Sequence, residues 1–515
     1  MRHSGWFLMV PCLCASSFFA GHAQSSSAAS GEDAPENITV AAPLDYTLYN
    51  ISASTSFSTG GQTPFWMVSN RYGLVPLQAN NASLQAQVYH YQPLGGKFHF
   101  HAGLDLVAVT PRYRKVYVQQ LFAEVAYDWL HLSVGSRGDA DHEADYHASL
   151  PDVSLSSGDL ALSSNARPIP EINLYTPHFI RVPWTGGWLQ VRGNFAAGRS
   201  FDTDYLESFV RTAQYYNRDV LWHHKSVYLR MKDTENDFPF SMTVGLRHIA
   251  QWGGVSTNPA AGTQPHSLKD FIRVVMGQSG GDDATASDRI NVLGNHYGTY
   301  DLQLGYERPD ASLHVYYQHF FDDASGMEFD NALDGLMGVQ LNLHGHGTHR
   351  WLNKILVERL NMLNQSGPFH FISFDHDKYP GYGGGGDNYY NNGEYVTGAS
   401  YFNRSTGSPL LVSPEYNTGG ELGFRHNRIT AWYLGVEGDL AKDFSYRLRC
   451  SDMESRGTPY APTLKKLHAL SVAATVTYQC RHAWLFALTL ATDRGDLLGN
   501  HAGVGFSITR RGFLR

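Results

Sequence analysis

The sequence predicts an all-β fold, a transmembrane antiparallel β-barrel of about 18 strands whose extracellular loops occlude the lumen. Three observations support this fold class: an export signal at the start of the chain, strands that alternate apolar and polar residues, and connections that alternate between short and long. At 515 residues the chain is long enough for two or three soluble domains or for one large barrel. The three observations together favour the barrel.

The start of the chain has the organisation of a signal peptide. A positively charged start precedes an apolar run that ends at Ala20, and Gly21-His22-Ala23 is the small-x-small pattern that signal peptidase cuts. Cys12 opens the alternative of lipidation, although the preceding Met9-Val10-Pro11 matches a lipobox poorly. We therefore expect a signal peptide over 1–23, a Ser-rich disordered leader over 24–44 and the barrel over 45–515.

The composition of the remaining chain excludes several classes of protein. No later stretch has ~18 consecutive apolar residues, so we expect no helical membrane span. Aromatic residues make up 13% and charged residues only 17% of the chain, which suits many strands and turns. The formal net charge of −8 argues against a nucleic-acid partner. Export through a signal peptide and a barrel fold together predict a location in the cell outer membrane.

Several segments alternate apolar and polar residues with a period of two. In 98–106 the residues Phe98, Phe100, Leu104 and Leu106 share one face, while Asp105 lies on the other. The same pattern occurs in 238–247, 300–306 and 444–449. Strands of a membrane barrel turn apolar residues toward lipid and polar residues toward the lumen. Many outward positions are aromatic, as expected for the girdles at the two membrane interfaces.

Short connections alternate with long ones, as in outer-membrane barrels, where the short turns face the periplasm. The short turns lie near 93–96, 128–129, 233–237, 308–310, 439–443 and 481–482, and the long segments near 58–82, 137–187, 251–297, 322–334, 364–428 and 452–467. The strands between these breaks number about seventeen, and a weak candidate around 197–204 raises the number to about eighteen, since bacterial single-chain barrels have an even number.

Removal of the signal peptide leaves two cysteines, Cys450 and Cys480. We expect them at opposite ends of neighbouring antiparallel strands, roughly 40 Å apart before strand tilt. A disulfide requires Cα atoms only ~4.4–6.8 Å apart. The sequence therefore predicts two free thiols.

Several loop motifs occur in order along the chain. Leu155-Ser156-Ser157-Gly158 is followed by the motif Ser163-Ser164-Asn165-Ala166-Arg167-Pro168-Ile169-Pro170. Other motifs lie at 63–66, 69–73, 223–226, 251–254, 322–327, 364–368 and 387–392. No single motif is specific, but the ordered set resembles the capsule assembly protein Wzi family in its Bacteroidales form, from about residue 45 to the end of the chain.

The resemblance implies an outer-membrane barrel that binds or organises capsular or related surface polysaccharide at the cell surface. It implies no enzymatic activity, and we expect no cofactor. We expect surface polysaccharide and outer-membrane lipid as partners, no nucleic acid, and a monomer. Two alternatives remain open. One is a diffusion channel, since eighteen strands are wide enough for an aqueous pore; the other is an outer-membrane hydrolase, which only the long aromatic loops favour.

No catalytic residues are predicted. The chain has no G-x-S-x-G elbow, no P-loop and no C-x-x-C. The adjacent pairs Asp282-Asp283 and Asp322-Asp323 would point to opposite faces of a strand, which does not suit the paired carboxylates of a glycosidase. The acidic and histidine-rich stretch 139–147 places His142 and His147 five residues apart, so it lacks the spacing of a zinc protease helix. We expect a solvated loop there and no metal.

The first candidate polysaccharide-binding residues lie in the predicted loop 137–187, in its segment with two prolines, 165–170. The prolines make a stiff extended stretch that presents Asn165 and Arg167 to an acidic or hydroxyl-rich glycan. The alternative is a loop that plugs the barrel, with Arg167 paired to a carboxylate in the lumen. His223, His224 and Lys225 either bind anionic sugar near the rim or serve as satisfied polar groups.

The remaining candidates are aromatic and amide residues in long loops. Trp252 precedes two glycines, and Tyr389, Tyr390, Asn391 and Asn392 follow a run of four glycines. Aromatic faces stack on the C–H faces of sugar rings, while amide groups donate to and accept from sugar hydroxyls. The alternative is a glycine-hinged loop that folds back into the lumen through its tyrosines.

Overall fold

The computed structural model describes residues 45–138, 150–233, 235, 238–322, 324–331, 333–344, 350–366, 386–480 and 483–514. The signal peptide and leader predicted over 1–44 lie outside the described residues, as does the acidic stretch 139–147. The barrel predicted for the rest of the chain is the part that the structure describes.

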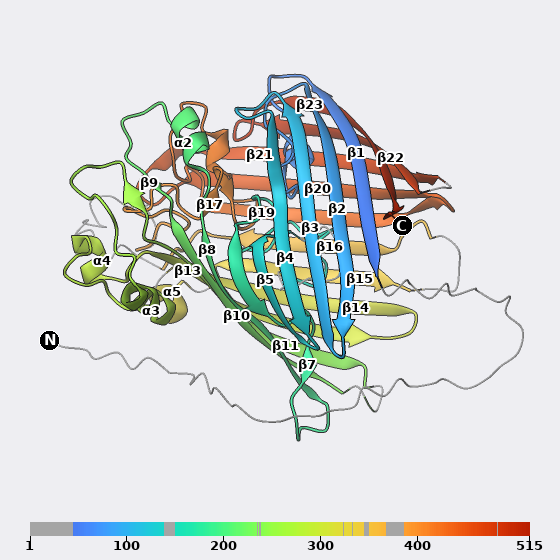
Figure 1. Ribbon diagram of the computed structural model, residues 1–515. Coiled ribbons are helices and arrows are strands. Elements are labelled where there is room, and N and C mark those ends of the chain that lie inside the picture. The colour runs from blue at the N-terminus through green and yellow to red at the C-terminus, as the bar shows by residue number, and fades with distance from the viewer. Residues whose placement is uncertain are drawn as a thin grey trace, which may run out of the picture. The chain divides into compact units, whose positions relative to one another are not determined.

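Nineteen strands form one antiparallel sheet that closes on itself, because the first strand pairs with the last over Thr47↔Leu514 to Ser58↔Gly503 (Figure 1). The strands of the barrel are β1 (Tyr46–Ser58), β2 (Asn81–Gly95), β3 (Phe98–Thr110), β4 (Val116–Tyr127), β5 (Leu130–Ser136), β6 (Glu171–Tyr175), β7 (Ile180–Arg181), β8 (Leu189–Arg199), β10 (Leu221–Lys232), β11 (Phe240–Trp252), β13 (Asn295–Glu307), β14 (Ala311–Phe321), β15 (Gly335–Leu343), β16 (Lys354–Asn361), β19 (Ile429–Ala441), β20 (Phe444–Gly457), β21 (Pro462–Cys480), β22 (Trp484–Gly495) and β23 (His501–Leu514). Both β6 and β7 pair with β8, so they occupy one position between β5 and β8. Counting these two together leaves eighteen strand positions, which confirms the prediction.

The shorter elements lie in the loops. They are the pairs β9 (Asn217–Arg218) with β12 (Val255–Ser256) and β17 (Ser400–Tyr401) with β18 (Arg404–Ser405), the helices α1 (Phe65–Val68), α2 (Thr203–Phe209), α3 (Leu268–Met276), α4 (Ala286–Ile290) and α5 (Ala324–Met327), and the 3-10 turn η1 (Pro414–Tyr416). Within the described ranges, none of these helices has the length and apolar character needed to cross a membrane.

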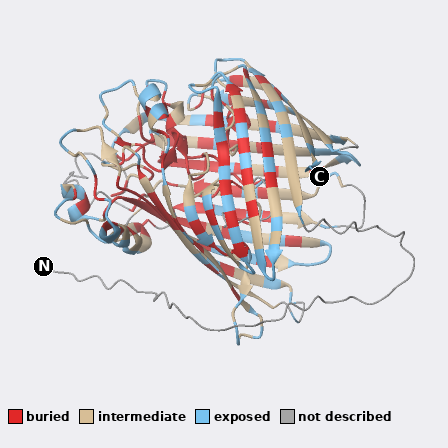
Figure 2. Ribbon diagram, viewed as in Figure 1, coloured by how far each residue is buried: buried red, intermediate tan, exposed pale blue. Residues whose placement is uncertain are grey.

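The predicted alternation is present along the strands, where buried and exposed residues succeed one another (Figure 2). On β3, Leu104 and Leu106 are exposed on the outer face, while Asp105 between them is fully buried on the lumen side. On β13, Leu302 and Leu304 are exposed and Asp301 is buried. An apolar exterior around a polar interior is the arrangement that lipid requires of a barrel. The protein is therefore an outer-membrane β-barrel.

The ends of the strands next to the short turns carry pairs of aromatic rings. Phe98 packs against Tyr127 at 4.7 Å between ring centroids, and Phe240 against Tyr306 at 4.8 Å. Both pairs join neighbouring strands, and most of these rings are exposed. They form the interfacial girdle that the aromatic outward positions predict. The short-turn end accordingly lies at the periplasmic interface, and the long loops lie at the extracellular end.

Two predicted strand boundaries are wrong. The weak strand around 197–204 is the end of β8 followed by α2, and the eighteenth position is instead filled by β6 and β7 inside the segment predicted as one long loop. The long loop predicted over 452–467 consists mostly of β20 and β21.

Both cysteines are free, as predicted. Cys480 ends β21, but Cys450 lies within β20 and pairs in register with Val472 rather than ending its strand. The two thiols are therefore separated by about eight residues of strand, roughly 26 Å. This is less than the sequence predicts, but it is still several times the span of a disulfide.

Tyrosine rings lie over lumen-facing glycines of neighbouring strands. Tyr228 is opposite Gly245, and a Cβ added to that glycine would stand 2.1 Å from the ring. Tyr316 covers Gly338 in the same way, also at 2.1 Å. These glycines are therefore required by the close approach of the rings.

We expect Gly245→Val to destabilise the barrel by about 1–3 kcal/mol, the usual cost of overpacking a filled interior. The reason is the clash with the buried ring of Tyr228. The measurement is the unfolding temperature of the detergent-solubilised barrel. Gly393→Val is the matched control, because Gly393 is exposed and nothing lies within 4 Å of its added Cβ. Equal unfolding temperatures for the two variants would contradict the expectation.

Candidate functional site

Three loop segments fill the lumen, and we call their described residues, 59–80, 150–170 and 386–428, the plug. One buried apolar cluster joins Trp66, Leu155 and Tyr390 of the three segments to Phe320 and Tyr433 of the barrel wall. Loops that enter the lumen and share a core with its wall leave no open pore through that core. The prediction that the loops occlude the lumen is confirmed.

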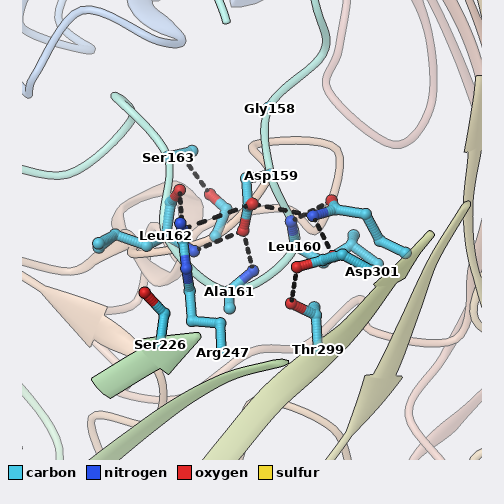
Figure 3. Close-up of polar contacts among 12 residues, drawn as sticks. Gly158, Asp159, Leu160, Ala161, Leu162, Ser163, Ser226, Arg247, Thr299 and Asp301 are labelled. Carbon is cyan, nitrogen blue, oxygen red and sulfur yellow. Dashed lines mark hydrogen bonds and ion pairs between the residues drawn. The ribbon is translucent and has the colours of Figure 1, made fainter. Parts of the chain in front are cut away.

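Asp159 fixes the plug to the wall of the barrel (Figure 3). Its carboxylate accepts hydrogen bonds from the backbone N–H groups of Ala161 at 2.7 Å and Leu162 at 2.9 Å. It also accepts one from Gln318 on β14 at 2.8 Å and lies 3.5 Å from Arg247 on β11. The side chains of Asp159 and Arg247 are 1% and 0% exposed. A buried charge pair of this kind is tolerated only when its remaining hydrogen-bonding groups are satisfied.

A second carboxylate extends the same network. Asp301 accepts hydrogen bonds from Gln318 Nε2 at 2.8 Å, Tyr228 Oη at 2.9 Å and Thr299 Oγ1 at 3.3 Å. Gln318 thus bridges the two aspartates, and its own Oε1 accepts from the backbone of Leu160 at 3.1 Å. The network spans β10, β11, β13, β14 and the plug, so the position of the plug is set by the wall.

The structure places the first pair of predicted site residues inside the plug. Asn165 is buried, donates to the carbonyl of Ser405 at 3.1 Å and accepts from the backbone of Asn70 at 3.3 Å. It therefore joins all three plug segments. The Arg167 guanidinium lies 4.4 Å from the ring centroids of both Tyr117 and Phe402.

Arg167 also donates to the carbonyl of Val118 at 2.7 Å. No carboxylate in the described part of the chain forms an ion pair with it. Together with His224, Arg167 lines an internal cavity of about 60 Å³. At ~30 Å³ for each water molecule, this cavity is too small for a sugar ring.

Three of the second group of predicted residues, His223, Lys225 and Trp252, lie on the outer wall near the extracellular end, beneath α3, whereas His224 faces the lumen. His223 is fully buried and donates from Nδ1 to the carbonyl of Ala196 at 2.9 Å. Lys225 donates to the carbonyl of Val275, and Trp252 packs on Phe271 of α3 at 5.6 Å. The helix thus covers this part of the wall with protein.

The third group is in the plug segment 386–428. Tyr389 and Tyr390 are fully buried, and the Tyr390 hydroxyl donates to the carbonyl of Leu160. Asn391 and Asn392 are half-buried and shape turns: the Asn391 amide accepts from the backbone of Phe424 at 2.7 Å, and the Asn392 amide accepts from the backbone of Tyr395 at 3.0 Å. The predicted residues therefore do not meet at one exposed site, and their contact with polysaccharide stays a prediction.

An open groove of about 420 Å³ lies at the extracellular end, and we call it the outer groove. Its lining comes from four loops and consists of Gly61, Gln62, Pro76, Leu77, Gln78, Arg112, Tyr113, Tyr205, Ser208, Phe209, Arg211, Phe402, Arg404, Glu415, Asn417, Thr418 and Gly420. Its volume falls within the ~300–1,000 Å³ typical of ligand sites.

Aromatic rings form a continuous patch in the outer groove. Tyr113 contacts Tyr205 edge-on at 5.1 Å, Tyr205 lies 5.5 Å from Phe402, and Phe209 stacks on Tyr205 at 5.8 Å. Tyr113 is 39% exposed, so its ring is available to a ligand. Phe402 is the ring on which Arg167 is stacked from the plug.

Arginines flank this patch. Arg404 pairs with Glu415 at 2.6 Å and donates to the carbonyl of Val75 at 2.8 Å, which holds two plug segments together. Arg112 donates to the carbonyl of Gly73 at 2.8 Å. Arg211 is exposed, and no ion pair of its side chain occurs among the described residues. With Glu415 engaged by Arg404, the outer groove carries positive charge beside exposed aromatic surface.

Sequence reasoning misses the outer groove because its residues lie outside the motifs. Arg112 and Tyr113 belong to the connection 111–115 between β3 and β4, which is too short to be noticed among the long loops. Tyr205 directly follows the segment 197–204, which is predicted as a weak strand. The available signal is the run Pro111-Arg112-Tyr113-Arg114-Lys115, a cationic and aromatic loop. Within the described residues no group of three or more His, Cys, Asp or Glu side chains is placed to hold a metal.

Comparisons with known proteins agree with this architecture. The family model described as capsule assembly protein Wzi matches residues 156–410. Among solved structures, the barrel is similar to Wzi of Escherichia coli, described as an outer membrane protein involved in group 1 capsule assembly and a carbohydrate-binding β-barrel; the identity is 11%, the TM-score 0.53, and 90% of this chain and 83% of that chain are covered. At this identity the similarity shows the fold.

The barrel is also similar to OccK5 (OpdH) of Pseudomonas aeruginosa, with 10% identity, a TM-score of 0.44, and 92% of this chain and 98% of that chain covered. A TM-score this low supports no argument about function. No curated protein is significantly similar to the chain in sequence.

We expect Asp159→Ala to loosen the plug, because it leaves the Arg247 guanidinium buried without its carboxylate partner. Breaking a buried pair from one side costs about 3–5 kcal/mol. In planar lipid bilayers the unaltered barrel should be electrically silent and the variant should show channel openings. Asp310→Ala is the control, since Asp310 forms an exposed pair with Arg308 at 3.7 Å. An equally silent variant with unchanged unfolding temperature would show that Asp159 does not hold the plug.

We expect the stability of the folded protein to fall as the pH rises from about 4 to about 6, in part through Asp202, which lies in the extracellular loop between β8 and α2. Burial raises the pKa of Asp202 from 3.8 to about 6, although the backbone N–H of Phe402 donates to its carboxylate at 3.4 Å. A folded-state pKa above the unfolded value means that folding retains a proton in this window, so stability is lost as the pH rises through it. In Asp202→Asn the fall in unfolding temperature between pH 4 and pH 6 should be smaller than in the unaltered protein. An identical fall in both would rule out this contribution.

Proposed function

We propose that the chain is a member of the capsule assembly protein Wzi family, and that it binds surface polysaccharide in the outer groove and so holds it at the outer membrane. In this proposal the barrel is a monomer embedded in lipid, and it catalyses no reaction. The observation that carries the proposal is the combination of the exposed ring of Tyr113 with arginines in a groove at the extracellular end. The carbohydrate binding described for Escherichia coli Wzi, which shares this fold, supports it.

The chemistry of the outer groove suits a sugar chain. The ring of Tyr113 offers an apolar face to the C–H face of a pyranose, and the amides of Gln78 and Asn417 suit its hydroxyl groups. The guanidinium groups of Arg112 and Arg211 suit the carboxylate of an acidic sugar. The groove is open rather than enclosed, as a site for an internal segment of a long polymer must be.

The residues predicted from the loop motifs serve the outer groove indirectly in this proposal. Arg167 supports Phe402 from below, and Asn165 ties together the three plug segments that carry the groove. Tyr389, Tyr390, Asn391 and Asn392 hold the segment 386–428 in place. His223, His224, Lys225 and Trp252 hold the neighbouring wall and its covering helix.

The test is direct binding of purified protein to surface polysaccharide from the bacterium that makes it. We expect Tyr113→Ala and Arg211→Ala each to weaken binding about tenfold, since one aromatic or charge-assisted contact contributes about 1.5 kcal/mol. Both side chains are accessible, so the variants should fold as the unaltered barrel does.

Tyr215→Ala is the matched control, because Tyr215 lies in the same loop as Arg211, is 54% exposed and does not line the outer groove. The proposal fails if the groove variants bind as tightly as this control. Release of shortened fragments from a labelled polysaccharide would separately overturn the non-enzymatic part. Deletion of the protein should release polysaccharide from the cell surface, and reintroduction of Tyr113→Ala should restore its retention only in part.

A further inference from the structure

A second hollow lies in the lumen against the plug and extends from there toward the short-turn end, and we call it the lumenal cavity. It has two lobes of about 220 Å³ and about 330 Å³ that share Arg71, Ala487, Thr489 and Ser507 in their linings. The larger lobe reaches the strand ends, where Asn353 lies directly before β16 and Asp439 near the end of β19. The larger lobe therefore lies toward the periplasmic end of the barrel, and the smaller lobe lies against Met67 and Leu74 of the plug.

Three arginines meet in the lumenal cavity. Arg71 enters from the plug, and Arg447 and Arg449 lie two residues apart on β20, so both point into the lumen. Arg447 pairs with Glu437. Arg449 is 5% exposed, and its guanidinium lies 5.6 Å from the ring of Trp66; no carboxylate in the described ranges pairs with it.

Arg71 is the least satisfied of the three. Its Nε is buried and has no hydrogen-bond partner, and no ion pair of its side chain occurs among the described residues. Burial and the charges of Arg449 and Arg447 lower the pKa of Arg71 to about 9. The charged guanidinium of Arg71 is repelled by the two neighbouring arginines. An anion placed between the arginines would relieve this repulsion and would therefore bind favourably.

The carboxylates nearby are already engaged at the rim. Glu437 contacts Arg447 and Lys354, and Asp439 accepts from the side chain of Asn353 at 2.9 Å. The walls around the arginines carry hydroxyl groups instead, among them those of Ser52, Ser54, Ser83, Thr475, Thr489 and Ser507. Thr475 and Thr489 face each other at 2.9 Å between their oxygens. Hydroxyl groups both donate and accept, as the hydroxyls of a sugar do.

We propose that the lumenal cavity binds an acidic carbohydrate that enters from the periplasmic side. Arg71 and Arg449 hold its anionic group, and the Ser and Thr hydroxyls of the wall contact its ring hydroxyls. Arginine is the side chain suited to planar or tetrahedral oxyanions, because its forked donors match their oxygens. The inference concerns the lumen only and does not depend on what the outer groove binds.

The test is isothermal titration of the detergent-solubilised full-length barrel with glucuronate, glucose and inorganic phosphate. We expect glucuronate to bind at least about tenfold more tightly than glucose, since only glucuronate engages the arginines. Arg71→Gln and Arg449→Gln should each weaken glucuronate binding about tenfold or more. Arg308→Gln is the matched control, because Arg308 lies at the same end of the barrel and is 62% exposed outside the lumenal cavity. In the Tyr113→Ala background, in which the outer groove is weakened, Arg71→Gln should still remove glucuronate binding, which separates this site from the outer groove.

Each arm has an outcome that overturns the proposal. Equal binding of glucuronate and glucose, or loss of binding in Arg308→Gln alone, would exclude the arginine site. Phosphate binding as tightly as glucuronate would exclude the carbohydrate, because the hydroxyl-lined wall would then contribute nothing. Without ligand, Arg71→Gln should unfold at the same temperature as the unaltered protein or at a higher one, since a repelled charge is removed; a lower temperature would contradict the repulsion on which the site depends.

Discussion

The buried pair of Asp159 and Arg247 is the interaction on which the rest of the molecule depends. Eighteen strands enclose a lumen too wide for wall side chains to fill, so the polar face of the wall needs partners from elsewhere. Asp159 connects the plug to that wall, and its carboxylate also accepts hydrogen bonds from the backbone N–H groups of Ala161 and Leu162 in the plug. The segment 155–162 held in this way accepts hydrogen bonds from Tyr390 of another plug segment and from Tyr433 of the wall, so it positions the rest of the plug.

The plug therefore supports the loops that form the outer groove. The outer groove draws on four connections, and each of them is tied to the plug or to another loop by buried hydrogen bonds such as those of Arg404 and Asn165. Loops held in this way lose little conformational freedom when a ligand binds, so more of the contact energy is available for affinity. The plug also separates the outer groove from the lumenal cavity, so the two ends of the barrel present chemically distinct surfaces on the two sides of the membrane.

The sequence is sufficient for the barrel and for the orientation of its ends, because alternation of period two and loop length are local properties of the chain. It predicts the strand number through parity, yet it misplaces one strand: β6 and β7 are short and lie inside a loop rich in turn residues. The candidate site is harder to predict. Tyr389 and Tyr390 have the composition of a sugar-binding loop, but the plug buries them. Tyr113, Tyr205 and Phe402 are nearly 300 residues apart at the extremes, and only the closed sheet brings them together.

The covering of the outer wall by α3 has a consequence for how the protein sits in its bilayer. On other parts of the wall, outward residues such as Leu104 and Leu121 are exposed. Along β8, β10 and β11, however, Phe271 and its helix occupy that surface, so the lipid-facing belt is shorter there. A belt of unequal height is accommodated by tilting the barrel axis or by thinning the adjacent leaflet. The molecule therefore has a preferred direction within the plane of the membrane, and neighbouring lipids and proteins meet two unlike flanks.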